Sequence, residues 1–477
     1  MPSRWIAYRL SAGTFLPQCA RSGEHKRCQY EIVQIWGGNL ELPHILCLTV
    51  CKNVNYEQKR TGRTGNPGTV ITRTPVITGI GVAAPNGLGL DRFWKNTLQR
   101  KSGVTTVSLF GAEGLPCRIA GEVSELREND CTLPPGLTRA TLLALHAARL
   151  ALTDARLVRE HAPEDEPVPV ILGTSTGSPE PLPRQWPSDK GADDEFVYQP
   201  ACTSPQAQAV WSIQRLGDLN GPVVTLSGGW TAGLEAVSLA AEWVRMGRYR
   251  IALAGAVEAP LSRRVLESFL ESGGLAARAD PEGVPRPFDR DRDGWVLSEG
   301  AAVVVVESAT SAWAREMQPY ACVAGCYSSG GRKYSDMAES LAQAIRGCLA
   351  EASLLPEHIQ YVCANATGER TTDVAEIAAL KRAFGRHAYR LAISSIKGVV
   401  GNPLAAAGPM QVAAAAMSIR EKRIPPTANL REPDPQCDLD CVRDRARQVA
   451  VRAALVNAHG RDGNSRCIVM TTAEGTA

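Results

Sequence analysis

The sequence lacks the features that would place a protein in a membrane, on nucleic acid or outside the cell. No apolar run reaches the length of a membrane span, because the best candidate, residues 40–50, is broken by Glu41, Pro43 and His44. The formal net charge of +3 is too small to indicate a nucleic acid or a membrane surface as partner. No secretory signal pattern is visible. The fourteen cysteines have no His or Cys partners at zinc-site spacing, so they indicate reduced thiols in a cytoplasmic protein without a metal site.

The chain is organised around residues 221–244, GPVVTLSGGWTAGLEAVSLAAEWV. The apolar residues of 223–226 predict a short buried strand, Gly228 and Gly229 permit a sharp turn, and helical spacing of apolar residues follows at once. A nucleophile on such a turn would be activated by the helix dipole and by backbone N–H groups. Trp230 occupies that point and cannot act as a nucleophile. Taken alone, a tryptophan there is typical of a core residue.

Elsewhere, strands and helices alternate in two rounds. The pattern predicts helices and strands in the first round at residues 91–98, 138–153, 168–173, 250–256 and 301–307. A second round begins near Tyr320 and predicts elements at residues 321–326, 337–350, 359–364 and 373–384. Residues 1–73 show no sustained period. We expect them to be an appended tail or upstream sequence from a misplaced start.

From Pro75 to Thr472 the chain resembles the β-ketoacyl synthases. The resemblance rests on the elbow at 221–244 and on residues 286–300, RPFDRDRDGWVLSEG, a charged loop followed by a glycine turn and a buried strand. It implies an α/β protein with the thiolase-like fold, a duplicated five-layered α/β/α/β/α architecture. The implied organisation is a non-family extension at 1–73, an N-terminal half at 74–319 and a C-terminal half at 320–477.

The resemblance also implies where catalytic groups would lie. Ketosynthases carry a cysteine at the elbow and two histidines, one in an N-A-H-G-T loop and one in a K-x-x-x-G-H loop. By register, Trp230 occupies the cysteine position and Asn365 and Asn402 occupy the histidine positions, whereas Lys397 is retained. Asparagine amides donate hydrogen bonds but cannot shuttle protons near neutral pH. Arg461 lies at the gating phenylalanine position, where it would put charge in the path of an acyl chain. No catalytic residue, cofactor or metal is therefore expected.

Two short strings imitate catalytic motifs. Cys202 lies in A-C-T-S, but no strand-turn-helix surrounds it and Pro205 follows. His459 lies in N-A-H-G after an expected strand at 449–456 and before another at 466–470, which favours an ordinary turn histidine. An acyl-transferring condensing enzyme with a relocated nucleophile, Cys202 or Cys363, and with Lys397 as a cation, stays an alternative.

The function implied is that of a catalytically silent ketosynthase homologue similar to the chain-length factor of type II polyketide synthases, in polyketide or fatty-acid-like biosynthesis. Such a subunit pairs with an active ketosynthase α subunit as a heterodimer, meets acyl carrier protein through that partner and shapes the acyl tunnel. Segments 174–182 and 196–204 are the expected tunnel ends. The usual residue of that class at position 230 is glutamine, so tryptophan is a departure. A homodimeric acyl-binding scaffold is the third alternative.

Overall fold

The strands of the chain come from both rounds of the sequence pattern. The first round supplies β1 (Pro75–Ala84), β2 (Gly87–Leu88), β5 (Val170–Gly173), β6 (Val223–Leu226), β7 (Ile251–Glu258) and β8 (Gly300–Ser308). The second supplies β9 (Ala321–Gly330), β10 (Tyr361–Cys363), β11 (Ala392–Ser394), β14 (Ala453–His459) and β15 (Asn464–Thr471). Two small sheets pair β3 (Val104–Thr106) with β4 (Ile119–Gly121) and β12 (Arg423–Ile424) with β13 (Arg447–Gln448).

The strands of the main sheet repeat one pairing pattern. The computed structural model describes residues 73–126, 137–157, 166–177, 205–277, 281–282 and 284–473. Within these, the order is β11-β10-β14-β15-β9-β1-β8-β7-β5-β6, with β2 beside β1. β5 is parallel to β6 and β7, and β10 is parallel to β11 and β14. The remaining neighbours in each half are antiparallel, and β1 meets β9 between the halves. The predicted duplication is therefore confirmed.

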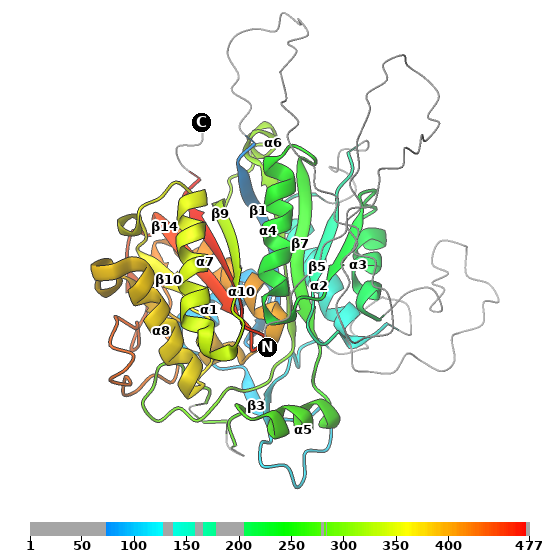
Figure 1. Ribbon diagram of the computed structural model, residues 1–477. Coiled ribbons are helices and arrows are strands. Elements are labelled where there is room, and N and C mark those ends of the chain that lie inside the picture. Colours follow the sequence, from blue (N-terminus) through cyan, green and yellow to red (C-terminus); the bar gives the residue numbers. More distant parts are fainter. Residues whose placement is uncertain are drawn as a thin grey trace, which may run out of the picture. The chain divides into compact units, whose positions relative to one another are not determined.

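Helices cover both faces of each half. They are α1 (Leu90–Leu98), α2 (Arg139–Asp154), α3 (Pro205–Leu216), α4 (Ala232–Arg245), α5 (Arg263–Ser272), α6 (Ala309–Ala314), α7 (Met337–Glu351), α8 (Arg370–Phe384), α9 (Lys397–Val400) and α10 (Ala407–Glu421). One apolar cluster joins α2 and α3 to the first-half strands, and another joins α7 and α8 to the second-half strands. A third, containing α4 and α10, lies between the halves. These clusters make the five layers that the sequence predicts, and the two sets of strands lie side by side in Figure 1.

Strand β8 shows why the central strands are continuous apolar runs. Its residues 301, 303 and 305 pack against the outer helices, whereas residues 302, 304 and 306 pack against the middle layer. Because successive side chains point to opposite faces and both faces are covered, every position from 301 to 306 is apolar. Strand β6 differs, since its residues are only half-buried. The prediction of a buried strand there was wrong, because β6 lies at the sheet edge with β5 as its neighbour among the described residues.

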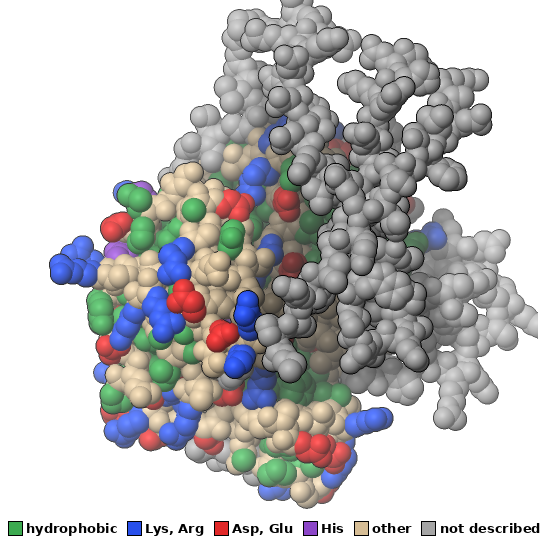
Figure 2. Space-filling view, in the orientation of Figure 1, with side chains coloured by type: hydrophobic (Ala, Val, Ile, Leu, Met, Phe, Trp, Pro, Cys, Tyr) green, Lys and Arg blue, Asp and Glu red, His purple; other side chains and the backbone are tan. Residues whose placement is uncertain are grey.

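The surface carries no dominant charge on the face that can be inspected. In Figure 2, basic, acidic and hydrophobic side chains are interspersed over the coloured part of the molecule. None of the helices within the described ranges combines the length and the apolar character needed to cross a membrane. The extension predicted at residues 1–73 lies outside the described residues except for Arg73.

Candidate functional site

The elbow around Trp230 is a strand-turn-helix, as the sequence predicts. β6 ends at Leu226, a 3₁₀ turn (η4) covers Gly229–Thr231, and α4 begins at Ala232. Gly229 has a φ of 70°, a left-handed conformation that glycine adopts without strain. Asp462 lies over this turn, because a Cβ on Gly229 would lie 2.9 Å from the Asp462 Oδ2 atom. The turn therefore packs against the loop between β14 and β15.

Trp230 is half-buried in an aromatic cluster. Its ring meets that of Trp295 edge-on, with centroids 5.4 Å apart and planes at 73°. Trp295 is fully buried and makes a second edge-on contact with Phe269, at 5.2 Å. Such T-shaped geometry is favourable beyond the burial of area alone. The place where an elbow nucleophile would lie is thus filled by an apolar side chain held by two others.

The charged loop before Trp295 pairs mainly with distant residues. Within the loop, Arg290 and Asp291 are 3.6 Å apart and exposed. Arg292 is instead 1% exposed, with Nη1 2.6 Å from Asp434 Oδ2 and Nε 3.6 Å from Asp373 Oδ2. The loop is therefore fastened to the second half of the chain and fixes the approach to Trp295.

Three side chains at or just beyond the ends of three strands form a buried polar chain. Lys397 Nζ donates to Asn365 Oδ1 at 2.7 Å. The Asn365 amide nitrogen lies 3.1 Å from His459 Nε2, so it donates there when that ring nitrogen carries no proton. All three residues are at most 3% exposed. Each strand end of this region, those of β10, β11 and β14, supplies one member.

Carboxylates and amides hold the backbone of the Asn365 loop. Glu376, which is fully buried, accepts from Asn365 N at 2.9 Å and from Ala366 N at 2.8 Å. Asn457 Oδ1 also accepts from Asn365 N, at 2.9 Å. Glu376 Oε2 lies 3.8 Å from His459 Nε2. The loop conformation is therefore specified by buried acceptors.

Burial shifts the protonation of this region. Desolvation lowers the pKa of Lys397 to about 7, although Glu376 and Asp373 act in the opposite sense. Desolvation likewise raises the pKa of Asp373 to about 7, despite hydrogen bonds from backbone N–H groups and the charge of Arg292. Both groups are thus poised near neutrality, far from their ordinary values.

The prediction that His459 is an ordinary turn histidine was wrong. It is the last residue of β14, is 2% exposed and contacts Asn365. β14 is parallel to β10, with Val456 opposite Cys363, so the chain beyond each strand end comes together. His459 is a site residue that sequence reasoning missed. The N-A-H-G string was the available signal, but its meaning depended on strand pairing.

Asn402 takes no part in the polar chain. Its side-chain oxygen and nitrogen are buried without a hydrogen-bond partner among the described residues. Its backbone is fixed by the first half of the chain, since its N–H donates to Val296 O at 2.7 Å and its carbonyl accepts from Ser298 N at 3.2 Å. The structure therefore brings Asn365, Lys397 and His459 together and leaves Asn402 on the first-half side.

Arg461 is held by polar groups. Its Nη2 is 3.1 Å from Glu369 Oε1, and its Nη1 donates to the Ser272 carbonyl at 3.1 Å. The guanidinium of Arg461 is therefore fixed in place by an ion pair, and its position in an acyl path stays a prediction.

The cysteine alternatives fare differently. Cys363 is fully buried in β10, and burial raises its pKa to about 12, which leaves almost no thiolate at neutral pH. Cys202 and most of the expected tunnel-end segments lie outside the described residues, apart from 174–177. No group of three or more potential metal ligands occurs within the described ranges.

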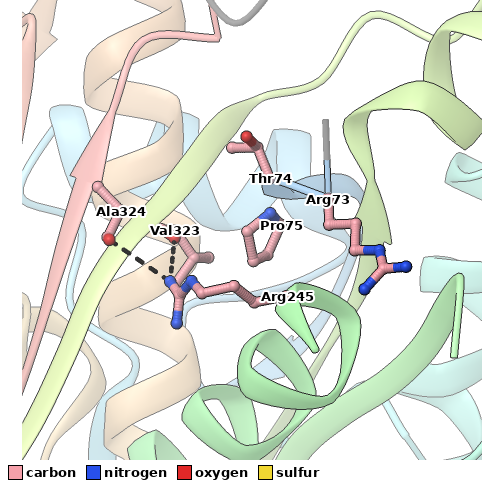
Figure 3. Close-up of a pocket in the computed structure, with 6 residues that line it drawn as sticks. All are labelled: Arg73, Thr74, Pro75, Arg245, Val323 and Ala324. Carbon is pink, nitrogen blue, oxygen red and sulfur yellow. Dashed lines mark hydrogen bonds between the residues drawn. The ribbon is translucent and has the colours of Figure 1, made fainter. Parts of the chain in front are cut away.

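A cavity of about 350 Å³ in the described part of the chain lies away from this site. It is lined by Arg73, Thr74, Pro75, Arg245, Val323 and Ala324 (Figure 3). Arg245 ends α4 and donates to the carbonyls of Val323 and Ala324. Because α4 has 14 residues, the cavity lies about 21 Å along the helix from the elbow. The candidate site itself is filled by its own side chains.

Comparison with known proteins gives a consistent family. Residues 73–312 match the family model described as the β-ketoacyl synthase N-terminal domain, and residues 320–431 match the C-terminal domain. The tetracenomycin polyketide synthase ketoacyl synthase alpha subunit of Streptomyces glaucescens is 35% identical over 426 residues, which cover 84% of this chain and 97% of the relative.

Two solved structures share the fold over most of the chain. The ishigamide ketosynthase/chain length factor has a TM-score of 0.73 at 28% identity, covering 84% of this chain and 99% of the other. A type II polyketide synthase acyl carrier protein in complex with its ketosynthase, bound to the hexaketide, gives a TM-score of 0.72 at 28% identity, covering 84% and 100%.

Proposed function

The chain belongs to the β-ketoacyl synthase family, and from this premise we propose that it is a catalytically silent subunit of a type II polyketide synthase. In this role it pairs with an active ketosynthase and helps to shape the tunnel for the growing chain, as a chain-length factor does. The observation that carries the proposal is Trp230. It stands where the resemblance puts the elbow nucleophile, and its ring packs edge-on against that of Trp295.

The polar side of the site supports the same conclusion. Decarboxylative condensation needs a thiolate, imidazoles that stabilise the enolate, and donors for the oxyanion. Asn365 and Asn402 supply amides where the family has imidazoles, and Lys397 is tied to Asn365. The framework that would hold catalytic groups is present, whereas the groups themselves are replaced.

The edge of the sheet at β6 supports the proposal that this chain binds a partner chain. β6 is half-buried, and α3, which packs beside it, exposes 39% of Trp211. Family members named above include a ketosynthase/chain length factor pair and a ketosynthase in complex with an acyl carrier protein. We infer a heterodimer through this edge, with the carrier protein engaged through the active partner.

The enzyme alternative loses one of its two nucleophiles. Cys363 has the burial and raised pKa of a structural thiol, and the hydrogen bond of Lys397 goes to Asn365 Oδ1. The remaining form of that alternative depends on Cys202. The scaffold alternative differs from our proposal only in its partner, so an assembly measurement separates the two.

Co-expression with an active ketosynthase α subunit of a type II polyketide synthase tests the proposal. We expect a stable one-to-one complex by size and mass analysis, and condensing activity that requires both chains. Trp211→Asp should weaken the complex, whereas the matched control Leu355→Asp, at a residue 63% exposed in the other half, should not. A homodimer that never takes up the partner would sink the proposal, and acylation at Cys202 would favour the enzyme alternative.

A further inference from the structure

A 3₁₀ turn (η7, Gly385–Arg390) is anchored to the second half of the chain between α8 and β11. Phe384 and Ala388 are 4% and 0% exposed and pack in the apolar cluster of that half. A ring nitrogen of His387 lies 2.8 Å from the carbonyl oxygen of Ile359, just before the neighbouring strand β10. The turn therefore presents its outward side chains from a fixed backbone.

The outward side chains of η7 are two arginines and a tyrosine. Arg386, Tyr389 and Arg390 are exposed, and Tyr389 is 57% exposed. Because side chains three residues apart eclipse one another in a 3₁₀ turn, Arg386 and Tyr389 lie on the same face. Lys381 Nζ lies 5.6 Å from the centroid of the Tyr389 ring, within the range of a cation–π contact. We call Arg386, Tyr389 and Arg390 the η7 patch.

The positive charge of the η7 patch is not balanced within the described residues. Residues 379–390, ALKRAFGRHAYR, contain five basic side chains and no acidic one. The two in α8, Lys381 and Arg382, each pair with an acidic residue of another segment. The two arginines of the η7 patch make no ion pair or side-chain hydrogen bond in the described ranges. Positions 386 and 390 are about 8 Å apart along a 3₁₀ axis, close to the Debye length at physiological ionic strength, so their charges repel.

The η7 patch is remote from the inferred partner edge. η7 leads into β11, which begins at Ala392, and β11 and β6 lie at opposite ends of the strand order of the main sheet. A ketosynthase bound at the β6 edge would therefore leave the η7 patch open to a second partner.

We propose that the η7 patch is a docking surface for an acidic segment of a second protein. Arg386 and Arg390 bind carboxylates of that segment, and Tyr389 receives one of its apolar side chains. A guanidinium presents paired N–H donors that match a carboxylate, and a tyrosine ring offers contact area at little cost in conformational entropy. Because the turn is already anchored, binding has little of the chain to order. The proposal adds a partner beyond the ketosynthase and does not depend on the proposed function.

The size of the η7 patch favours an acidic protein segment over other anionic partners. Nucleic acid is bound through many phosphate contacts, but the net charge of the chain is only +3, and basic and acidic side chains are interspersed on the face shown in Figure 2. A membrane-surface helix needs a long apolar face, whereas η7 exposes one aromatic ring. Two guanidinium groups and one ring match a short acidic segment.

Fluorescence anisotropy on the full-length chain tests the proposal. The probe is a short rhodamine-labelled peptide that repeats Glu-Glu-Leu-Glu. We expect Arg386→Glu combined with Arg390→Glu to raise the Kd for this peptide at least about tenfold, because two attractive contacts become repulsive. Tyr389→Ser should raise the Kd about threefold, through loss of an exposed aromatic contact.

The matched control is Arg149→Glu combined with Arg156→Glu. These two exposed arginines, in and just after α2, also lack an ion pair among the described residues, and the control changes the net charge by the same amount. It should change the Kd less than about twofold. Chemical denaturation should show no loss of stability in the η7 variant, because charge reversal relieves repulsion. If that variant unfolds, Arg386→Gln combined with Arg390→Gln removes the charges alone and should raise the Kd about fivefold.

An equal loss of affinity in the two charge-reversal variants would show attraction to the net charge of the chain and would overturn the η7 patch. A thymidine oligonucleotide or phosphatidylserine vesicles that bind the η7 patch, when the peptide does not, would overturn an acidic protein as its partner. The measurement uses the chain alone. Failure to pair with a ketosynthase, which counts against the proposed function, therefore leaves this result unaffected.

Discussion

β6 and β11 occupy corresponding places in the two halves, but the turns that follow them are chemically opposite. After β6 comes Trp230, packed against Trp295 in an apolar cluster. After β11 comes Lys397, a buried lysine that donates a hydrogen bond to Asn365. The second half has kept a specified hydrogen-bond framework, whereas the first has filled the nucleophile position. Under the proposed function, this difference means that catalytic silence arose by replacing reactive groups within an intact scaffold.

If the framework of the second half is structural, breaking it should give the largest loss of stability. Glu376→Ala leaves Ala366 N without its acceptor and Asn365 N with only Asn457, in a fully buried setting. We expect a loss of about 3 kcal/mol in the free energy of unfolding. Chemical denaturation of both proteins measures it.

The matched control for this change is Glu339→Ala. Glu339 pairs with Arg346 and Arg382 at the surface, where its side chain is 61% exposed, so its removal should cost under about 1 kcal/mol. Similar losses in the two variants would contradict the view that the Glu376 framework specifies the fold of the site.

The elbow in the first half was easier to predict from the sequence than the polar chain in the second half. The elbow is local, because a strand, two glycines and a helix lie within residues 221–244, so the position of Trp230 could be predicted. Burial of β6 could not, because it depends on which strand lies at the sheet edge. The five-layered fold followed from the family resemblance and from strands without a polar face.

The polar chain in the second half depends on strand pairings between segments that are distant in the sequence. His459 reaches Asn365 because β10 and β14 are parallel neighbours, a relation between segments 90 residues apart that no local pattern encodes. Read without this pairing, the N-A-H-G string around His459 therefore predicted a turn. The fastening of Arg461 to Glu369 and Ser272 is also non-local, whereas its charge at the gating position was readable directly.

The comparison can be sharpened by measuring how the protonation of buried Lys397 changes the free energy of unfolding with pH. The pKa of Lys397 is lowered to about 7 in the folded chain, against about 10.4 when unfolded. Between these values the unfolded state binds more protons, so this residue makes stability rise with pH, by at most about 1.4 kcal/mol per pH unit. Lys397→Met removes that contribution.

We therefore expect the difference in unfolding free energy between wild type and Lys397→Met to grow between pH 7 and 10. Taking the difference removes the effect of the cysteines, which titrate in both proteins. Lys381→Met is the control: hydrogen bonding to Asp438 raises the pKa of Lys381, so this lysine stays protonated in both states over that range. A constant difference for Lys397→Met would show that the lysine is charged in the folded chain.

The smallest expected effect is on turnover, and it tests whether a thiol at the elbow is enough for catalysis without imidazoles in the second half. Trp230→Cys restores the elbow nucleophile in the first half, yet we expect malonyl decarboxylation and condensation to stay at background when this variant is assayed with malonyl and acyl thioesters. The positions that would carry imidazoles hold Asn365 and Asn402, and the His459 ring nitrogen already contacts the Asn365 amide. An amide cannot move the proton that the reaction requires.

The matched variant adds Asn365→His and Asn402→His to Trp230→Cys, and its turnover should exceed that of the single variant. Turnover above background in Trp230→Cys alone would mean that His459, supplied from the end of β14, acts as the missing imidazole. The second half would then be chemically competent, and Trp230 would be the sole cause of silence. Background turnover in the single variant, with labelling of its thiol, instead separates a reachable nucleophile from a working site and keeps the two halves distinct.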